Sequence, residues 1–381
     1  MIFWLALLMM GVPNANAWDS HFLLMHWVLP GLSSSTALKL DEKTTNSCPP
    51  QDEEVYERYR RALLLNPLSR LPSPSPACPA PTVSGREILG STTVLDEPDR
   101  GMDQELDSKP GNPYDPLDER KFLGGYHGTT SQGFRHMYFG GWKLAHPIAT
   151  FQVPTHALGQ APMRIQLLAS QARELIRGSA ATPQDRVWGY RILGWAIHYA
   201  QDLAQPFHAT QIPNLRMVPW NVLFNAIFTD PLHPAQAFNA LVKETTRTIS
   251  NYHWAYETYT LLQVKAGDQS PYAKCLSNPE LYSNLQFDST HSGPEELGHA
   301  VANASIKIAS RMGHAEYDFF GSDLKEPNHN LPLNIGMPNY VEYATRADLK
   351  EPRERLNAVT CTALSNAVLA SRDLIEWALQ P

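Results

Sequence analysis

The chain has 381 residues and a formal net charge of −7, with 43% hydrophobic and 18% charged residues. This balance is typical of globular proteins, and it excludes disordered and collagen-like classes. The acidic charge, without any run of Lys or Arg, argues against a protein held to nucleic acid or acidic lipid by long-range attraction. After the first residues, no apolar stretch approaches the ~20 residues that cross a bilayer, which excludes a multispanning membrane protein.

The N-terminus is predicted to be a signal peptide covering residues 1–17. An apolar run over 2–12 precedes Ala15-Asn16-Ala17, which has the small-x-small pattern of a cleavage site. No Lys or Arg precedes the apolar run, so a misassigned start and a short N-terminal core helix stay open as alternatives. We expect cleavage after Ala17, a mature chain that begins at Trp18, and a secreted protein in the periplasm or outside the cell.

The mature chain then has mostly helical patterning. A first apolar helix opens at Ser20-His21 and stops at Pro30-Gly31, and residues 52–66 form an amphipathic segment with acids in its first turn. The proline-rich residues 67–83 are predicted to be an extended surface loop, because proline removes backbone donors. Residues 93–135 are predicted to be a long irregular connection of the kind that builds a site.

Further helices are predicted over residues 157–178, 183–203, 235–264, 293–312 and 351–379. Little period-2 alternation is present, and we find no internal repeat. The sequence therefore predicts an all-α, multi-helix fold. We expect one domain over residues 18–381, with insertions at about 40–85, 100–135 and 210–250.

Four cysteines are present, and none forms a CxxC pair, which disfavours zinc–thiolate and redox-motif interpretations. An exported protein favours two disulfides instead. Three pairings are available. We favour Cys48–Cys78, which would close the proline-rich excursion, and Cys275–Cys361, which would tie back the C-terminal helix.

The segment most informative about chemistry runs from His198 to His208, HYAQDLAQPFH. On a helix, His198 and Asp202 lie four residues apart and project from one face. Pro206 ends the regular helix, so His208 is free to point into a neighbouring site.

A second pair with the same spacing, His253 and Glu257, falls on a later predicted helix. Imidazole nitrogens and carboxylate oxygens suit zinc. Each pair alone is a weak signal, because such spacing occurs by chance, but the two pairs together indicate a metal site.

In this arrangement the chain resembles the zinc-dependent phospholipase C family, which is related to zinc-dependent single-strand nucleases. Members begin the mature chain with a tryptophan that binds zinc through its amine and carbonyl, and then carry their ligands in a fixed order. The matching residues here are Trp18, His21, Asp99, His136, His198, Asp202, His208, His253 and Glu257. Asp96 and Asp103 are alternatives to Asp99.

The resemblance implies three zinc ions. The first would be held by Asp99, His136, His198 and Asp202, the second by His208, His253 and Glu257, and the third by Trp18, His21 and Asp202 as a bridge. An α-amino group has a pKa near ~7.7, so it gives up its proton to zinc more easily than a lysine does. Only cleavage before Trp18 would create that ligand.

The function implied is a secreted zinc phospholipase C that hydrolyses phosphatidylcholine, or a related phospholipid, to diacylglycerol and a phosphorylated head group. Zinc would activate the attacking water, with Asp99 as general base or water-orienting carboxylate. We expect a phospholipid substrate at a membrane surface, no nucleic acid partner, and a monomer. A zinc-dependent single-strand nuclease is the alternative, disfavoured by Glu257 and the acidic charge. A non-catalytic zinc-stabilised binding protein is a third.

One apolar insert, residues 217–228, has two interpretations that the sequence leaves equal. It is either a helix that docks on lipid or a buried cover helix.

Overall fold

The computed structural model describes residues 21–45, 82–91, 136–138, 142–145, 150–153, 159–210, 213–229, 234–287, 293–325, 343 and 345–380. Several predictions fall outside these residues: the signal peptide 1–17, the helix 52–66, the connection 93–135, and the residues Trp18, Cys48, Cys78, Asp96, Asp99 and Asp103.

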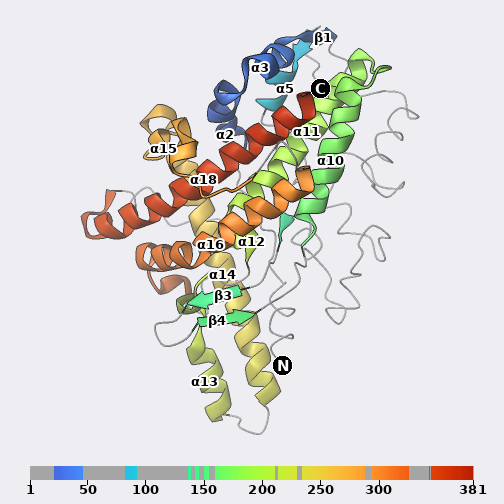
Figure 1. Ribbon diagram of the computed structural model, residues 1–381. Helices are drawn as coiled ribbons and strands as arrows, with labels where there is room; N and C mark the ends of the chain where they lie inside the picture. The colour runs from blue at the N-terminus through green and yellow to red at the C-terminus, as the bar shows by residue number, and fades with distance from the viewer. Residues whose placement is uncertain are drawn as a thin grey trace.

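The described part of the chain is an all-α fold, as predicted (Figure 1). Its α-helices are α2 (His21–Val28), α3 (Ser34–Asp41), α5 (Gly85–Leu89), α10 (Ala161–Arg177), α11 (Pro183–Ala204), α12 (Pro206–Ala209), α13 (Trp220–Thr229), α14 (Pro234–Val264), α15 (Ala273–Ser277), α16 (Pro294–Phe320) and α18 (Lys350–Leu379). Short 3-10 turns are η1 (Leu29–Gly31), η3 (Leu215–Met217), η4 (Gly267–Gln269), η5 (Pro279–Leu281), η6 (Asp323–Lys325) and η7 (Ala347–Leu349).

Two small antiparallel sheets, each of two strands, complete the described elements. β1 (Lys43–Thr45) pairs with β2 (Thr82–Ser84) in the register Lys43↔Ser84, and β3 (Trp142–Ala145) pairs with β4 (Thr150–Val153). The prediction of an irregular loop through residue 83 is wrong at its end. The β-branched Thr82 and Val83 follow the last proline of that segment, so their backbone N–H groups are free to pair.

The predicted helix 293–312 is too short, because α16 continues to Phe320. Gly313, which follows the predicted end, is a packing position inside the helix. A Cβ on Gly313 would lie 2.8 Å from the Cβ atoms of Pro213 and Asn214, so glycine here allows a close approach between α16 and the chain that follows α12.

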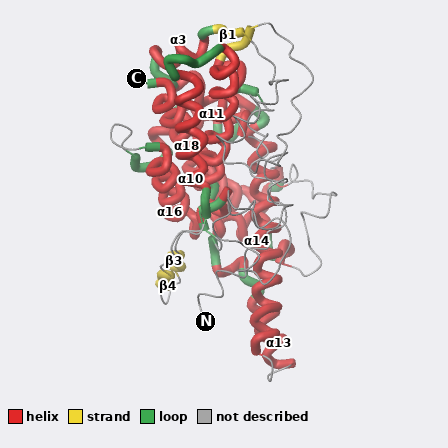
Figure 2. The backbone as a smooth tube through the Cα atoms, turned by 90° about the vertical axis from the view of Figure 1, so that its right-hand side faces the viewer, coloured by secondary structure: helices red, strands yellow, loops and turns green. Residues whose placement is uncertain are grey.

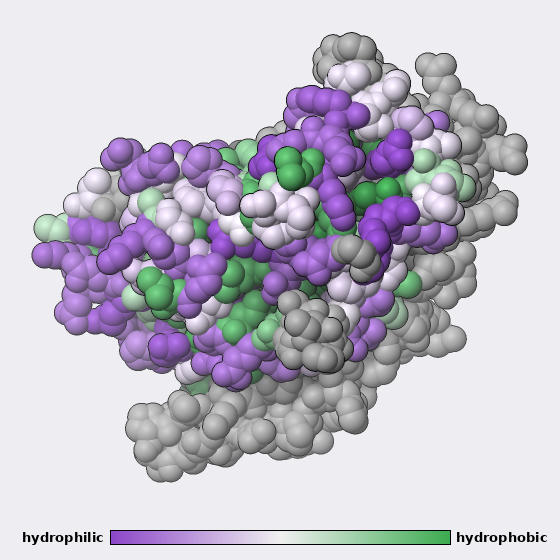
Figure 3. Space-filling view, turned by 45° about the horizontal axis from the view of Figure 1, so that its top comes forward, coloured by the Kyte–Doolittle hydropathy of each residue, from purple (hydrophilic) through white to green (hydrophobic). Residues whose placement is uncertain are grey.

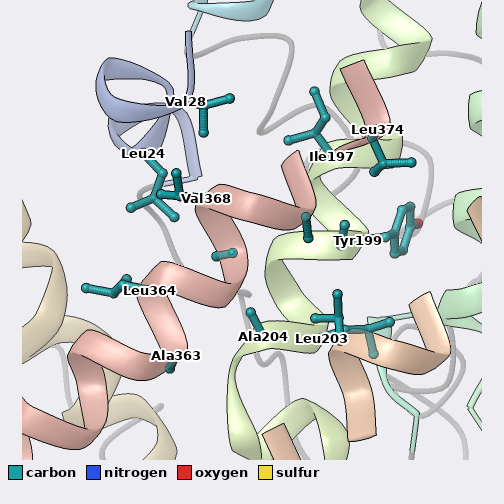
Figure 4. Packing of buried hydrophobic residues seen from close by; sticks show 14 of the residues in the cluster. Leu24, Val28, Ile197, Tyr199, Leu203, Ala204, Ala363, Leu364, Val368 and Leu374 are labelled. Carbon is teal, nitrogen blue, oxygen red and sulfur yellow. The ribbon is translucent and has the colours of Figure 1, made fainter. Parts of the chain in front are cut away.

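Helix α11 is the centre of the core. Every residue from Ile192 to Ala204 is buried, and α10, α16 and α18 pack around it. Figure 4 shows Leu24 and Val28 of α2 close to α18, with Ile197 of α11 beside the same helix. A helix with apolar residues on all sides is stable only when other helices enclose it. The few polar residues on this part of α11 are therefore held away from water.

The N-terminal helices are fastened to the C-terminal helix. The Glu376 carboxylate of α18 accepts hydrogen bonds from the backbone N–H of Ser33 at 2.6 Å and from the Thr36 hydroxyl at 2.5 Å. The Arg372 guanidinium donates to the backbone carbonyl of Trp27 at 2.9 Å. The predicted disulfide Cys275–Cys361 is confirmed and joins α15 to α18. These contacts fix α2, and with it His21, against the core.

Within the predicted insertion at 210–250, most of the described residues are helical. Helix α13 packs against α14, and the two project together from the helical body (Figures 1 and 2). On the face in Figure 3 hydrophilic residues dominate the described part, and the hydrophobic residues in view are mostly recessed between them. Among the described helices, none combines the length and the apolar character needed to cross a bilayer.

Candidate metal centre

Helix α11 brings two of the predicted ligands to the middle of the core. Its N-terminus is set by Thr182, whose hydroxyl accepts from the Asp185 N–H at 3.1 Å, and Pro183 follows at the first turn. From there the helix runs unbroken to Ala204. His198 and Asp202 therefore lie one turn apart, and both are completely buried.

His136 reaches the same place on a short segment held from both sides. The Tyr138 N–H donates to the His208 carbonyl at 2.8 Å, and the Gly159 N–H donates to the Tyr138 carbonyl at 2.9 Å. A Cβ on Gly159 would lie 1.7 Å from the Met137 carbonyl oxygen, so the two backbones approach this closely only because residue 159 is glycine.

The short helix α12 positions His208. Gln205 stands at its N-terminus, where the side-chain oxygen accepts from the Phe207 N–H at 2.6 Å, and Pro206 opens the first turn. The bend at Gln205 and Pro206 turns the chain away from the axis of α11, as predicted. His208 is completely buried.

The first group of ligand atoms is arranged around Asp202. One carboxylate oxygen, Oδ1, lies 3.2 Å from His21 Nε2. The other, Oδ2, lies 2.6 Å from His136 Nδ1 and 3.3 Å from His198 Nε2. The two oxygens of Asp202 thus face different histidines, and His21 approaches from the opposite oxygen to His136 and His198.

The hydrogen bonds of Gln201 determine the tautomer of His21. The Gln201 amide nitrogen donates to the Ser371 hydroxyl at 3.0 Å, which leaves the amide oxygen facing His21 Nδ1 at 2.9 Å. Because that oxygen only accepts, His21 Nδ1 carries the proton. His21 Nε2 then lies toward the Asp202 carboxylate, and His21 Nε2 and Asp202 Oδ1 have no hydrogen-bond partner in the described part of the chain.

The second group consists of His208, His253 and Glu257. His253 Nε2 lies 2.8 Å and His208 Nε2 lies 3.7 Å from Glu257 Oε1. The Gln205 amide nitrogen donates to the same oxygen at 3.2 Å. His208 Nδ1 lies 3.1 Å from the backbone carbonyl of His136, which only accepts, so Nδ1 carries a proton and Nε2 is the ring nitrogen that faces the group.

These donor sets fit a metal ion. Both groups, His21 with His198 and Asp202, and His208 with His253 and Glu257, place one ligand atom from each residue within 4.8 Å of the others, and all six residues are buried. An imidazole lone pair that faces a carboxylate in a buried site is unfavourable unless a cation or a proton lies between them. In His21 and His208 the far ring nitrogen bonds to an amide or carbonyl oxygen, an arrangement typical of metal-binding histidines.

The charge states favour cation binding. Burial opposes ionisation of Asp202, but the nearby His198, His208 and His21, together with the hydrogen bond from His136, hold its pKa well below its usual range. Burial lowers the pKa of His253 to about 3. At neutral pH the Asp202 carboxylate is therefore charged and the His253 imidazole is neutral, as metal ligands must be.

The structure brings together all the predicted ligands that it describes. His208, His253 and Glu257 form the group expected for the second zinc. The other group differs in composition: it contains His21, expected at the third zinc, with His198 and Asp202, and His136 contacts it through Asp202. Trp18 and Asp99, the remaining predicted ligands, lie outside the described residues.

Three polar residues at this centre were not predicted. Gln201 and Gln205 lie inside the His198–His208 segment, and the position of Gln205 directly before a proline was a usable signal for a helix N-cap. Glu316 of α16 is completely buried, and both its carboxylate oxygens lack a hydrogen bond in the described part of the chain. Burial, and then the charge of Glu257, raises the pKa of Glu316 well above its usual range.

Comparison with protein-family models, with curated proteins and with solved structures finds no match to this chain.

Proposed function

We propose that this protein is a secreted, zinc-dependent phosphodiesterase that hydrolyses phosphatidylcholine, or a related phospholipid, in the manner of a phospholipase C. The supporting observation is the pair of adjacent buried ligand groups built from imidazole and carboxylate alone. His21 and His208 are each oriented through Nδ1, so that Nε2 faces a carboxylate. No cysteine takes part, whereas closed structural zinc sites usually use cysteine.

Some residues of the centre would bind the metal, and others orient these ligands. Asp202 and the imidazoles of His21, His136 and His198 would hold zinc on one side, and His208, His253 and Glu257 on the other. Bound zinc would neutralise a phosphodiester and lower the pKa of a water molecule. The protein itself contributes orientation: Gln201 fixes the ring of His21, and Gln205 fixes the Glu257 carboxylate.

Two further parts of the proposal concern residues outside the described ranges. Trp18 would complete one site with its free amine after signal-peptide cleavage, and Asp99 would orient the attacking water. The first is tested by comparing protein that begins at Trp18 with protein carrying extra residues before it. Equal activity and equal zinc content in the two would remove Trp18 from the site.

The deciding experiment uses protein cleaved to begin at Trp18. Its metal content is measured by mass spectrometry, and its turnover of phosphatidylcholine is measured with and without a chelator, with single-stranded DNA assayed in parallel. We expect bound zinc and release of phosphocholine that the chelator abolishes. Nucleotide release without lipid turnover would favour the nuclease alternative. Bound zinc without either activity would indicate a zinc-stabilised binding protein.

His198→Ala is the sharpest variant, because His198 belongs to the central group and lies on the innermost helix. We expect it to lose activity and to bind less zinc. Full turnover at full metal content would overturn the proposal. His314→Ala, a change on the exposed side of α16, is the matched control.

A further inference from the structure

Helix α13 presents an apolar face to solvent. Trp220, Phe224, Ile227 and Phe228 are 42, 54, 39 and 82% exposed. Their spacing, i, i+4, i+7 and i+8, places them on one side of the helix. The interpretation of this segment as a buried cover helix is therefore wrong for these four side chains.

Helix α13 carries no charged side chain of its own. From Met217 to Thr229 the sequence contains no ionisable side chain, and its polar residues are asparagine and threonine. A helix whose exposed side is aromatic and aliphatic and that lacks charge is well matched by hydrocarbon, with Trp220 suited to the lipid–water boundary.

From these observations we propose that the exposed face of α13, defined by Trp220, Phe224, Ile227 and Phe228, docks on the surface of a phospholipid bilayer. This inference rests on the proposed function, because it supplies the contact between the enzyme and its lipid substrate. Since the face and the helix that carries it contain no cationic residue, the binding is hydrophobic and does not depend on anionic lipid.

The exposed residues also define the orientation. They extend from the first residue of α13 to its ninth, so the helix lies along the surface rather than inserting its tip. Helix α14 packs against α13 and carries His253 and Glu257 further along its length. From Pro234 to His253 the helix rises about 28 Å at ~1.5 Å per residue. If α13 and α14 stood upright on the lipid, His253 would be held about this far from it, whereas helices that lie flat do not impose this separation.

The docking test uses the full chain and vesicles of pure phosphatidylcholine, in flotation assays with a chelator to stop turnover. The variant is Phe224→Asp combined with Phe228→Asp. The matched control is Leu281→Asp, because Leu281 is 79% exposed but lies on η5, outside this face. We expect the double variant to bind vesicles at least about tenfold more weakly and the control to bind normally. Binding of wild-type protein should be unchanged at high salt.

Turnover of a short-chain, monomeric phosphatidylcholine separates this inference from the proposed function. We expect the double variant to hydrolyse the monomer normally while losing activity on vesicles. If wild-type protein binds vesicles but hydrolyses neither substrate, the proposed function fails and docking stands. If the double variant binds vesicles as wild type does, docking by α13 is overturned.

Self-association and misfolding of the double variant are tested separately. If wild-type protein sediments as a dimer and the double variant as a monomer, the face is a self-association surface and the lipid proposal is overturned. If the double variant does not fold, as judged by circular dichroism, Phe228→Gln replaces it at the most exposed position of the face. Unchanged vesicle binding by that variant would equally contradict the proposal.

Discussion

His208 Nδ1 lies 3.1 Å from the backbone carbonyl oxygen of His136, so a ligand of one group is oriented by the backbone that carries a ligand of the other. A second hydrogen bond joins the same two segments, because the Tyr138 N–H donates to the His208 carbonyl at 2.8 Å. The two groups are therefore not independent: a displacement of α12 moves both the ring of His208 and the segment that presents His136.

The first prediction separates these two roles of His208. Asparagine keeps an amide N–H near the position of Nδ1 but lacks Nε2. We expect His208→Asn to lose metal from the second group while the metal-free protein keeps most of its stability. His208→Ala should also lose about 1–3 kcal/mol of metal-free stability, because it leaves a buried carbonyl unpaired. Zinc stoichiometry and urea unfolding measure the two effects, and equal stability of both variants would show that the link is energetically neutral.

The second prediction concerns Gln201, which holds the His21 ring by its Nδ1 proton. Gln201→Leu keeps the volume but removes the acceptor, so the ring can rotate or change tautomer. We expect zinc affinity to fall by about 10–100-fold, the usual cost of losing an outer hydrogen-bond partner. Chelator competition measures this change. Gln166→Leu on α10, whose side chain bonds to Ser170 instead, serves as control; equal affinity in both variants would contradict the role of Gln201.

The third prediction is an acid instability of the metal-free protein. Burial lowers the pKa of His253 from 6.5 to about 3. Between these values the unfolded state binds the proton and the folded state does not, so the free energy of unfolding falls as pH falls through this window. One proton corresponds to a slope of about 1.4 kcal/mol per pH unit.

His253→Asn should remove this contribution, so its stability should depend less steeply on pH between 6.5 and about 3 than that of wild type. His314→Asn, at an exposed histidine, should keep the wild-type slope. Unfolding by urea at a series of pH values measures all three proteins. Parallel curves for wild type and His253→Asn would show that His253 is protonated in the fold.

The fourth prediction is that the disulfide Cys275–Cys361 stabilises the fold. It joins residues 86 positions apart, and removal of a native disulfide typically costs about 2–5 kcal/mol. We expect a loss of this size in the variant with both cysteines changed to alanine. Reduction of wild-type protein should produce a similar loss, whereas unchanged stability after both treatments would contradict a structural role.

Local signals in the sequence account for the helices and for most of the ligands. Each of three features depends only on residues a few positions apart: the start of α11 at a proline, the break at Pro206, and the i, i+4 spacing of His198 and Asp202. The same is true of His253 and Glu257 on α14. These features were predicted because helix geometry alone places the side chains on one face.

Contacts between distant segments could not be predicted in this way. Gln201 reaches Ser371 across 170 residues, and Gly313 is set by its approach to Pro213 rather than by helix propensity. The closeness of His21 to His198 follows from the packing of α2 on α18, which no local pattern encodes. Glu316 was missed for the same reason, since a single acid in an amphipathic helix resembles a solvated residue until the packing is known.

Glu316 provides the last prediction. Because burial and the charge of Glu257 raise its pKa well above 4.5, the folded metal-free protein keeps the Glu316 proton to a higher pH than the unfolded chain does. The folded state then binds more protons, so this group destabilises the fold increasingly as pH rises above 4.5. Glutamine has the same shape without the ionisation.

We therefore expect metal-free Glu316→Gln to be more stable than wild type at pH 7, with the advantage disappearing as pH falls below 4.5. Zinc should reduce the advantage, because a nearby cation favours the ionised carboxylate. Glu295→Gln, at an exposed position near the start of the same helix, should show neither effect. If Glu316→Gln were instead less stable than wild type at pH 7, Glu316 would be a charged, paired group in the fold.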